Sequence, residues 1–391
     1  MRVVINGLAA LKLKTGVGHH VANLANSLIR TSPANRFSLY PGERIGAAVR
    51  KFQTNSGKST PKANGASKPS IRSHLLGTAK SAAKLASAWH FTAYTRTFGF
   101  DLYHEPNFVP FPSHLPTVVT VHDLSVVRFP QWHPADRVKV HERHFHRGLK
   151  QAAHVIVVSK AVRMELIEST GIEPNRVTAI YNGINPAFRP MTREETAPVK
   201  AALGLPDRYF LCVGTIEPRK NIITAMKAYC DLPNELRQNC PLALVGPWGW
   251  KSEADREFYE STGKARGIRH LGYVTDEQMP ALFAGATGLV YPTFYEGFGL
   301  PPVEMLASGG RVLASTALVL REVCGTHADY LEPEDVSAWR DAMNRLATEP
   351  RSQERTAAVD QAGTFTWTRA AVETLAVYRK VLAESGRSRS Q

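Results

Sequence analysis

Short apolar runs alternate with helical patterns along most of this chain. The first run, Val3–Asn6, precedes apolar positions with helical spacing through Ile29, and comparable runs occur at Thr117–Val121 and His154–Ser159. Apolar runs of this length that are followed by helices are typical of βαβ units, in which parallel strands are buried on both faces of a sheet. The pattern therefore predicts an α/β protein.

A second series of the same kind begins near Tyr209, after a segment rich in proline and charge. That segment, Pro186–Pro206, has little apolar periodicity, so we expect a domain boundary there. At 391 residues the chain is too long for one ordinary core, and two domains are expected. We assign residues 1–190 to an N-terminal α/β domain, residues 191–365 to a C-terminal α/β domain, and residues 366–391 to a final helix and a polar tail.

The segment Thr293–Glu304 carries two carboxylates that bracket a glycine-containing bend and a Pro-Pro pair. An apolar run leads in and an apolar helical pattern leads out, so the local prediction is strand, tight loop and helix. Proline suits the first helical turn, whose free amides and partial positive charge favour phosphate. Because Glu296 precedes this helix end and Glu304 lies just inside the helix, the segment indicates a ligand with an anionic centre and hydroxyl groups at both ends. A nucleotide sugar has that shape.

Polar side chains also follow two other predicted strands. His122 and Asp123 end a buried strand, and Arg219 with Lys220 lies in the loop after the strand that ends at Thr215. Ligands of doubly wound sheets bind outside the carboxyl ends of the strands. A lone histidine is usually structural, but a His-Asp pair at a strand end favours a functional role. The two cations are placed to hold a diphosphate, with an exposed charged loop as the alternative.

A glycine loop at Gly16, Val17 and Gly18 separates the first strand from its helix. Two interpretations stay open for it. The glycines either admit a phosphate or the acceptor, or they serve a plain turn, and a GxG pattern alone does not decide between these.

The net charge of +14 is concentrated in the first half of the chain. Residues 1–190 hold 25 Lys and Arg against 9 Asp and Glu, a net charge of +16, whereas the remaining residues sum to −2. Candidate partners are an anionic membrane surface, nucleic acid or an acidic acceptor. We find no nucleic-acid-binding module in the sequence, so nucleic acid is not expected to be a partner.

Ten basic residues and no acid lie between Arg44 and Phe100. We expect a mobile loop at about residues 50–75, a stretch rich in Ser, Gly, Pro and Asn, and an amphipathic helix from Leu75 to Phe91. Basic and apolar residues on one helix are typical of attachment to a membrane surface. The alternative is a solvated loop followed by a core helix.

Three observations narrow the class of protein. No apolar run reaches the roughly 18 residues needed to span a bilayer, so a soluble or peripheral protein is expected. The four cysteines form no CxxC pair, which favours reduced thiols and a cytosolic compartment. The histidine-rich segment His141–His146 is flanked by basic residues that disfavour a cation, so we expect a basic helix there and no metal site.

Seven short motifs together resemble those of the retaining glycosyltransferases of family 4 (GT4), which have the GT-B fold. The resemblance covers essentially the whole chain and implies two Rossmann-like domains that face each other across a cleft, with the C-terminal helix returning to the N-terminal domain. The motifs are Gly16-Val17-Gly18, Val121-His122-Asp123, Val157-Val158-Ser159, Tyr181-Asn182-Gly183-Ile184, Val213–Asn221, Leu271-Gly272-Tyr273-Val274 and Glu296–Glu304.

The resemblance also implies a role for each part of the site. Glu304 holds the ribose hydroxyls, Glu296 contacts the donor sugar, and His122 reaches that sugar from across the cleft. The expected catalytic residues are His122, Asp123, Arg219, Lys220 and Glu296. The other expected donor-binding residues are Gly214, Thr215, Gly272, Tyr273, Val274, Gly297, Phe298, Gly299 and Leu300.

The expected chemistry needs no metal cofactor. Cleavage of the bond to the sugar leaves a nucleoside diphosphate anion, which Arg219, Lys220 and the helix end stabilise as its charge develops. The residues alone leave both same-face attack and a covalent intermediate on Glu296 open. The resemblance favours same-face attack.

The segment from His122 to Glu304 is most similar to bacterial mannosyltransferases of exopolysaccharide and O-antigen assembly. This implies GDP-mannose as donor, a polyprenyl-diphosphate-linked oligosaccharide as acceptor, and a peripheral location at the cytoplasmic face of the membrane. A UDP-sugar donor (glucosyl or GlcNAc) is the alternative, and an inactive membrane-attached scaffold is the alternative of another class. One departure is the pair His19-His20, where many relatives carry Arg or Tyr, and it leaves the acceptor-side role of the first loop open.

Overall fold

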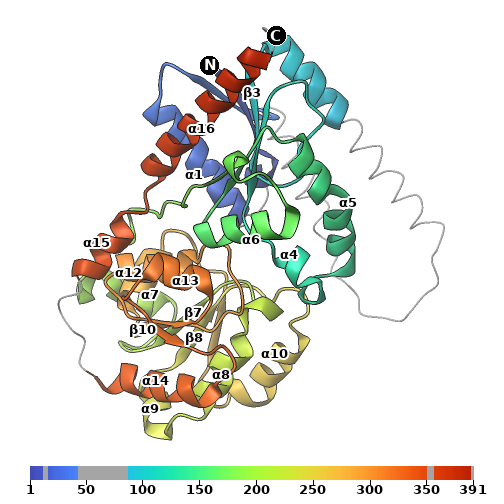
Figure 1. The fold of residues 1–391 in the computed structure, drawn as a ribbon. Helices are drawn as coiled ribbons and strands as arrows, with labels where there is room; N and C mark the ends of the chain where they lie inside the picture. Colours follow the sequence, from blue (N-terminus) through green and yellow to red (C-terminus); the bar gives the residue numbers. More distant parts are fainter. Residues whose placement is uncertain (12–15, 43–86, 350–355, 389–391) are drawn as a thin grey trace.

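Two sheets of six parallel strands organise the protein, one in each of two lobes (Figure 1). This computed structural model describes residues 1–11, 16–42, 87–349 and 356–388. The first sheet has the order β2-β1-β3-β4-β5-β6. Its strands are β1 (Arg2–Asn6), β2 (Arg36–Tyr40), β3 (Leu102–Glu105), β4 (Thr117–Val121), β5 (His154–Val157) and β6 (Val177–Ala179).

The second sheet has the order β12-β11-β10-β7-β8-β9. All the strand pairs in both sheets are parallel. Its strands are β7 (Phe210–Val213), β8 (Leu242–Val245), β9 (Arg269–Gly272), β10 (Gly288–Tyr291), β11 (Val312–Ser315) and β12 (Asp329–Leu331). The α/β prediction is confirmed.

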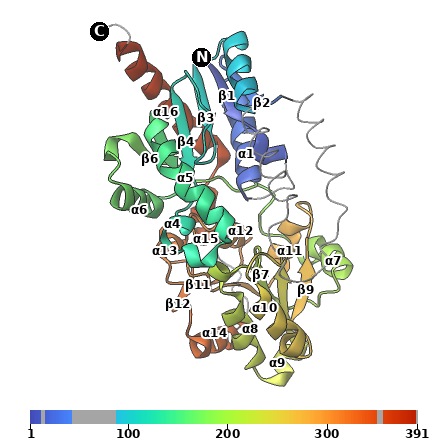
Figure 2. The same ribbon diagram turned by 90° about the vertical axis from the view of Figure 1, so that its right-hand side faces the viewer.

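Helices cover both faces of each sheet, as the view turned by 90° shows (Figure 2). The first lobe contains α1 (Gly16–Thr31), a helix over residues 87–98, α4 (Ser125–Arg128), α5 (Ala135–Gln151) and α6 (Lys160–Thr170). The second lobe contains α7 (Arg193–Ala202), α8 (Ile222–Cys230), α9 (Asn234–Asn239), α10 (Glu253–Phe258), α11 (Met279–Gly285), α12 (Leu300–Ala307), α13 (Leu318–Cys324), α14 (Val336–Thr348) and α15 (Thr356–Gly363). Helix α16 (Trp367–Ser388) ends the described chain.

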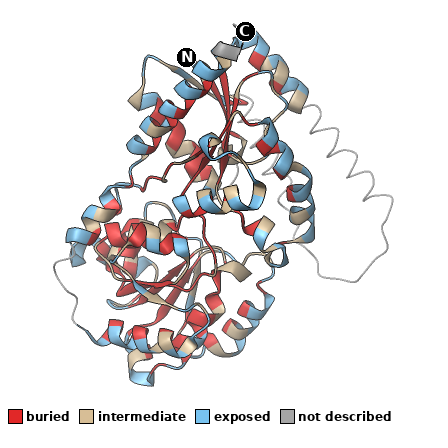
Figure 3. Ribbon diagram, viewed as in Figure 1, coloured by how far each residue is buried: buried red, intermediate tan, exposed pale blue. Residues whose placement is uncertain are grey.

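The central strands are buried along their whole length, which explains why they were predictable as apolar runs (Figure 3). The edge strands β2 and β12 were not predicted. Each is half exposed, and its mixed residues lack a continuous apolar run.

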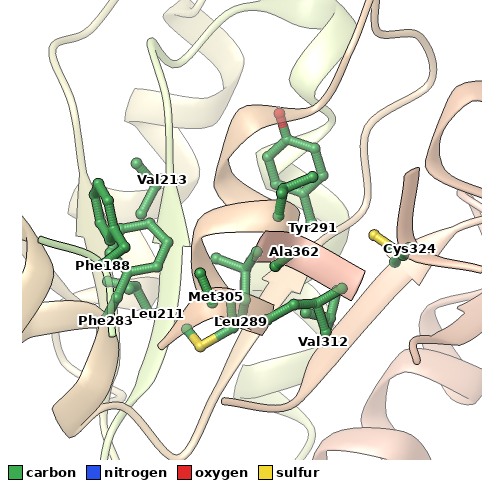
Figure 4. Close-up of a cluster of buried hydrophobic side chains, with 14 of the residues drawn as sticks. Phe188, Leu211, Val213, Phe283, Leu289, Tyr291, Met305, Val312, Cys324 and Ala362 are labelled. Carbon is green, nitrogen blue, oxygen red and sulfur yellow. The ribbon is translucent and has the colours of Figure 1, made fainter. Parts of the chain in front are cut away.

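The core of the second lobe packs helices α11 and α12 against β7, β10 and β11. In Figure 4 the ring of Tyr291 stands at the top of this cluster, and its hydroxyl points away from the other labelled side chains. Leu289, two residues earlier on β10, faces the same cluster because side chains alternate along a strand. Strand β10 therefore anchors its last residue in the core while presenting a polar group at its carboxyl end.

Helix α16 crosses back from the second lobe and packs on α1 (Figure 1). Ala371 and Tyr378 join Val3 and Leu28 in one buried cluster of the first lobe. The hydroxyl of Tyr378 also bonds to Nδ1 of His104 at 2.6 Å. The prediction that the C-terminal helix returns to the N-terminal domain is confirmed.

The chain passes between the lobes close to the predicted boundary at residue 190. Strand β6 ends at Ala179 and β7 begins at Phe210, but Ile184 and Phe188 already pack in the core of the second lobe. The loop expected at about residues 50–75 lies outside the described residues, as does the expected helix before residue 87.

Candidate active site

Glu296 is the centre of a buried polar cluster at the carboxyl ends of β7 and β10. Its Oε1 accepts from Lys220 Nζ at 2.5 Å, from the Tyr291 hydroxyl at 2.8 Å and from Thr293 Oγ1 at 3.0 Å. Its Oε2 accepts from Arg219 Nη1 at 2.9 Å. Strands β7 and β10 are neighbours in the sheet, so the loops that follow them meet. The structure thus brings together the two cations and the first glutamate of the sequence prediction.

The charges in this cluster stabilise one another. Burial alone would raise the pKa of Glu296, but Arg219 and Lys220 outweigh that effect and lower it to about 2. Burial lowers the pKa of Lys220 despite the neighbouring carboxylate. Glu217 forms a second ion pair with Arg219, at 2.6 Å from Nε, so the guanidinium is held between two carboxylates. We expected Glu296 to serve mainly as a sugar contact, whereas in the structure it also fixes both cations.

The end of β7 contacts both the Lys220 side chain and the loop after β8. Gly214 has a φ of +140°, and a Cβ there would lie 3.4 Å from the Lys220 side chain. The next residue, Thr215, lies directly against Gly249, where a Cβ would come within 2.6 Å of the threonine methyl. Gly214 therefore borders Lys220, whereas Thr215 borders the loop after β8.

His122 and Asp123 approach the cluster from the first lobe, at the end of β4. His122 Nε2 lies 2.9 Å from the carbonyl oxygen of Pro106, to which it donates, so Nδ1 carries the lone pair. Asp123 accepts from the amide and hydroxyl of Ser125 at 2.9 and 2.6 Å. Burial would raise the pKa of Asp123, but Arg219 and these hydrogen bonds lower it. The structure therefore places the His-Asp pair within electrostatic reach of the cation pair.

Gly297 lies directly against the chain of the first lobe at the site. A Cβ on this residue would lie 1.9 Å from the carbonyl oxygen of His122 and 3.0 Å from Cβ of Asp123. Only glycine allows this approach.

The loop continues into α12 as predicted. Gly299 precedes the helix with a φ of +91°, the helix begins at Leu300, and its first turn contains proline. The resemblance implied that Phe298 binds the donor through its backbone amide, and its side chain is buried between Tyr181 and Phe365, with ring centroids 6.1 and 5.6 Å away. It contributes packing, which leaves only its backbone available to a ligand.

Glu304 lies one turn inside α12. Burial, together with the nearby carboxylate of Asp276, raises its pKa to about 8. Gly272, with a φ of +64°, and the exposed Tyr273 form the loop before Asp276, whereas Val274 is buried. We did not predict Asp276. Its position two residues after the predicted base-binding loop was the available signal.

The predicted first glycine loop is the first turn of α1. Gly18 packs against the carbonyl oxygen of Ala9, which a Cβ would approach to 2.8 Å, and a Cβ on Gly16 would meet no atom of the described residues within 4 Å. Val17 packs at the edge of the first-lobe core. Packing against Ala9 explains why residue 18 is a glycine. No contact with the described residues explains the glycine at position 16.

The departure at His19-His20 has structural consequences that we did not predict. His20 is buried, its Nδ1 lies 2.9 Å from Asn182 Oδ1, and its ring packs edge-on against His122 with centroids 4.7 Å apart. His19 reaches the other lobe, with Nε2 3.9 Å from Asp276 Oδ1. His20 therefore supports the ring of His122.

The histidine-rich segment lies on α5. His141 is buried and stacks on Phe108 and Phe145 at 4.2 and 4.5 Å between centroids, whereas His146 is exposed. Within the described ranges no three His, Cys, Asp or Glu side chains are grouped to hold a metal ion. The expectation that catalysis needs no metal stays a prediction.

Buried titratable groups outside the ion cluster make stability depend on pH. Burial raises the pKa of Glu105 to about 8, as it does for Glu304, from a usual 4.5. Four histidines have a pKa that burial lowers from 6.5 to about 3 or 4. They are His104, His133, His141 and His154.

We expect the melting temperature to be highest near pH 6.5. Between about pH 4.5 and 6.5 the four histidines bind protons only in the unfolded chain, and the two glutamates bind protons only in the folded protein. Because four groups outnumber two, the unfolded chain binds more protons, and stability rises with pH. Above pH 6.5 the four histidines are neutral in both states, whereas Glu105 and Glu304 still hold protons only in the folded protein, so stability falls until about pH 8. Calorimetry across this range checks the maximum, and a continuous rise to pH 8 would contradict it.

Two family profiles match this chain. The profile described as Glycosyltransferase Family 4 matches residues 14–188, and the one described as Glycosyl transferases group 1 matches residues 194–362. O-antigen chain mannosyltransferase B of Escherichia coli is 35% identical over 282 residues, which cover 71% of this chain and 74% of that protein. The chain belongs to glycosyltransferase family 4.

Other relatives of this family 4 glycosyltransferase carry similar names. O-antigen chain mannosyltransferase RfbU of Salmonella typhimurium is 27% identical over 59% of this chain and 61% of its own length. The serotype-specific mannosyltransferase WbdA of Escherichia coli is 31% identical over 60% of this chain, but this match covers only 30% of that longer protein.

Solved structures show the same fold. Sucrose-phosphate synthase from Thermosynechococcus elongatus has a TM-score of 0.72 at 20% identity and covers 98% of this chain and 99% of its own. WaaG, a glycosyltransferase involved in lipopolysaccharide biosynthesis, has a TM-score of 0.65 at 16% identity, and the match covers 95% of this chain and 98% of the WaaG chain. The family 4 glycosyltransferase thus has the GT-B fold and is a hexosyltransferase, as the resemblance implied. No helix in its described ranges is both long and apolar enough to cross a membrane.

Proposed function

We propose that this enzyme transfers mannose, with retention of configuration, from GDP-mannose to a polyprenyl-diphosphate-linked oligosaccharide in exopolysaccharide or O-antigen synthesis. The observation that carries the proposal is the cluster of Arg219, Lys220 and Glu296 at adjacent strand ends, opposite His122. Two cations and the free amides of α12 suit a nucleoside diphosphate leaving group, whose negative charge grows as the bond to the sugar breaks.

Each part of the cluster has a role in this mechanism. Arg219 and Lys220 neutralise the diphosphate as the bond to the sugar breaks, and Glu296 holds both cations in place before the donor arrives. A preorganised site pays little reorganisation cost during the reaction. Glu296 is engaged by four donors, which suits a positioning group better than a nucleophile and favours same-face attack.

Asp276 is a candidate partner for the base of the donor. Asp276 lies close enough to raise the pKa of Glu304, and its carboxylate follows the loop assigned to the base. Guanine presents two adjacent N–H donors on one edge, which match the two oxygens of a carboxylate, whereas uracil presents one N–H between two acceptors. The names of the O-antigen relatives support mannose as the sugar. A UDP-sugar remains the alternative donor.

The basic first half of the chain supports an acceptor at an anionic surface. Residues 1–190 carry the whole excess of positive charge, and Trp89 on the helix over residues 87–98 is 75% exposed. An exposed tryptophan among basic residues suits the interface of a membrane. We therefore place the enzyme at the inner face of the cytoplasmic membrane, and flotation with anionic against neutral liposomes tests this attachment.

The function is tested with a panel of donors. GDP-mannose, UDP-glucose and UDP-GlcNAc are each supplied with membrane lipid extracts, and the product linkage is solved by NMR. Transfer of mannose through an α linkage supports the proposal, and transfer from a UDP-sugar alone supports the alternative donor. If all three donors stay intact, the protein is an inactive scaffold under these conditions and the proposal fails.

Glu304→Ala is expected to weaken binding of GDP by roughly 10- to 150-fold at pH 9, where Glu304 is ionised, because a charge-assisted hydrogen bond to the ribose contributes about 1.5–3 kcal/mol. Isothermal titration calorimetry measures this change. Glu334→Ala, on an exposed turn of the same lobe, is the matched control and should leave the affinity unchanged. Equal affinities of the two variants would remove Glu304 from the ribose site.

A further inference from the structure

Tyr295 joins the two lobes through its hydroxyl. The residue belongs to the second lobe and is 7% exposed. Its hydroxyl accepts from the backbone amide of Leu124 at 3.1 Å and donates to Glu165 Oε2 at 2.6 Å, both in the first lobe. Glu165 is itself held by an ion pair with Arg128. One phenol oxygen thus bonds to two separate elements of the opposite lobe.

The two ends of this link are next to the two halves of the site. Tyr295 is followed by Glu296, and Leu124 is preceded by Asp123. The carbonyl oxygen of Tyr295 also accepts from Arg219 Nη1 at 3.2 Å. A movement of Tyr295 therefore moves the carboxylate and the guanidinium that the proposed mechanism needs.

Aromatic side chains around the hydroxyl strengthen the contact between lobes. The ring of Tyr295 lies 5.4 Å from that of Phe129, and Phe294 stacks on Trp132 at 5.7 Å and 17°. The indole Nε1 of Trp250 donates to the carbonyl oxygen of Trp132 at 2.9 Å. These contacts hold the lobes together, but among the described residues of the second lobe only Tyr295 forms a side-chain hydrogen bond to the chain directly beside the His-Asp pair.

We propose that Tyr295 is a positioning residue that couples contact between the lobes to the placement of Glu296. When the lobes meet, its hydroxyl satisfies the Leu124 amide and the Glu165 carboxylate, and it fixes the loop before Glu296 against the strand end that bears Asp123. When the lobes separate, both hydrogen bonds are lost and the loop is held only by its own lobe. The catalytic groups are then aligned only while both lobes enclose the substrates.

The chemistry of a phenol suits this role. A tyrosine hydroxyl donates and accepts at once, so it can join a backbone N–H and a carboxylate. Phenylalanine preserves the ring contacts and removes both bonds, which leaves a buried amide and a carboxylate short of partners when the lobes meet. Tyr295→Phe therefore acts on the contact between lobes and does not touch Gly272, Tyr273 or Glu304, which are assigned to the base and the ribose.

The experiment compares the Tyr295→Phe variant with the wild-type enzyme. We expect kcat for transfer to fall roughly 10- to 100-fold, while the dissociation constant of GDP stays within about twofold. Small-angle scattering with bound GDP should give a larger radius of gyration for the variant. Tyr330→Phe is the matched control, because the Tyr330 hydroxyl donates to Gly325 O at 2.6 Å within the second lobe.

A second variant separates coupling from simple damage. Glu165→Gln removes the charge of the first-lobe acceptor, and its effect on kcat should be smaller in the Tyr295→Phe background than alone. The proposal is overturned if kcat of Tyr295→Phe is unchanged or falls only as much as kcat of Tyr330→Phe. It is also overturned if GDP affinity falls as much as kcat, or if the effects of Tyr295→Phe and Glu165→Gln on kcat are strictly additive. The inference rests on the proposed transfer reaction, but the scattering comparison does not. A protein that turns over no donor therefore still tests the link between the lobes.

Discussion

Glu296→Gln is expected to lower the free energy of unfolding by about 3–5 kcal/mol and to reduce transfer by at least about 10³-fold. The carboxylate is 8% exposed and pairs with Arg219 and Lys220, so its loss leaves two buried cations short of a counter-charge. A pKa lowered from 4.5 to about 2 corresponds to about 3 kcal/mol in favour of the ionised form, which agrees with that range. Chemical denaturation and steady-state kinetics measure the two effects.

The matched control for this change is Glu349→Gln. Glu349 also pairs with an arginine, Arg311, at 2.8 Å, but its side chain is 50% exposed. Solvent screens such a pair, so we expect a change of about 0–1 kcal/mol and full activity. If both variants were equally stable, Glu296 would not be the counter-charge that the buried cluster requires.

Gly297→Ala is expected to reduce transfer by about 100-fold or more while the affinity for GDP is kept. The new methyl group would lie 1.9 Å from the carbonyl oxygen of His122, so the lobes must move apart or the loop must shift. Displacement of reacting groups by about 1 Å costs on the order of 10²-fold in rate. Nucleotide binding depends on the second lobe and should survive, which calorimetry with GDP checks beside the transfer assay.

Gly363→Ala serves as the control for Gly297→Ala. A Cβ on Gly363 meets no atom of the described residues within 4 Å, and the residue is the last of helix α15, to which no residue of the proposed site belongs. This variant should retain wild-type transfer. Wild-type transfer by Gly297→Ala would mean that the lobes need not approach as closely as they do here.

The strand ends that carry the site were predictable because parallel sheets place their ligands there. His122, Arg219 and Glu296 each follow an apolar run that ends in polar residues, and that local pattern survives in the structure. The start of α12 was predictable for a similar reason, since proline and a glycine with positive φ mark a helix beginning.

Contacts between distant segments were not predictable in this way. Glu296 and Arg219 are far apart in sequence, and no local pattern says that one carboxylate accepts from both cations. The burial of Phe298 and the role of His20 beside His122 likewise depend on tertiary packing. In the sequence, Tyr295 is one of several aromatic residues near the glycine bend. Its hydroxyl has two partners because the first lobe packs against it, which no local pattern indicates.

The return of α16 to the first lobe has a consequence for protein synthesis. Ala371 and Tyr378 complete the core around Val3 and Leu28. They leave the ribosome only after the whole second lobe has been made. Domains usually fold in the order of their synthesis. In this chain the lobe that is translated first completes its core last, so the order of synthesis and the order in which the two cores close are reversed.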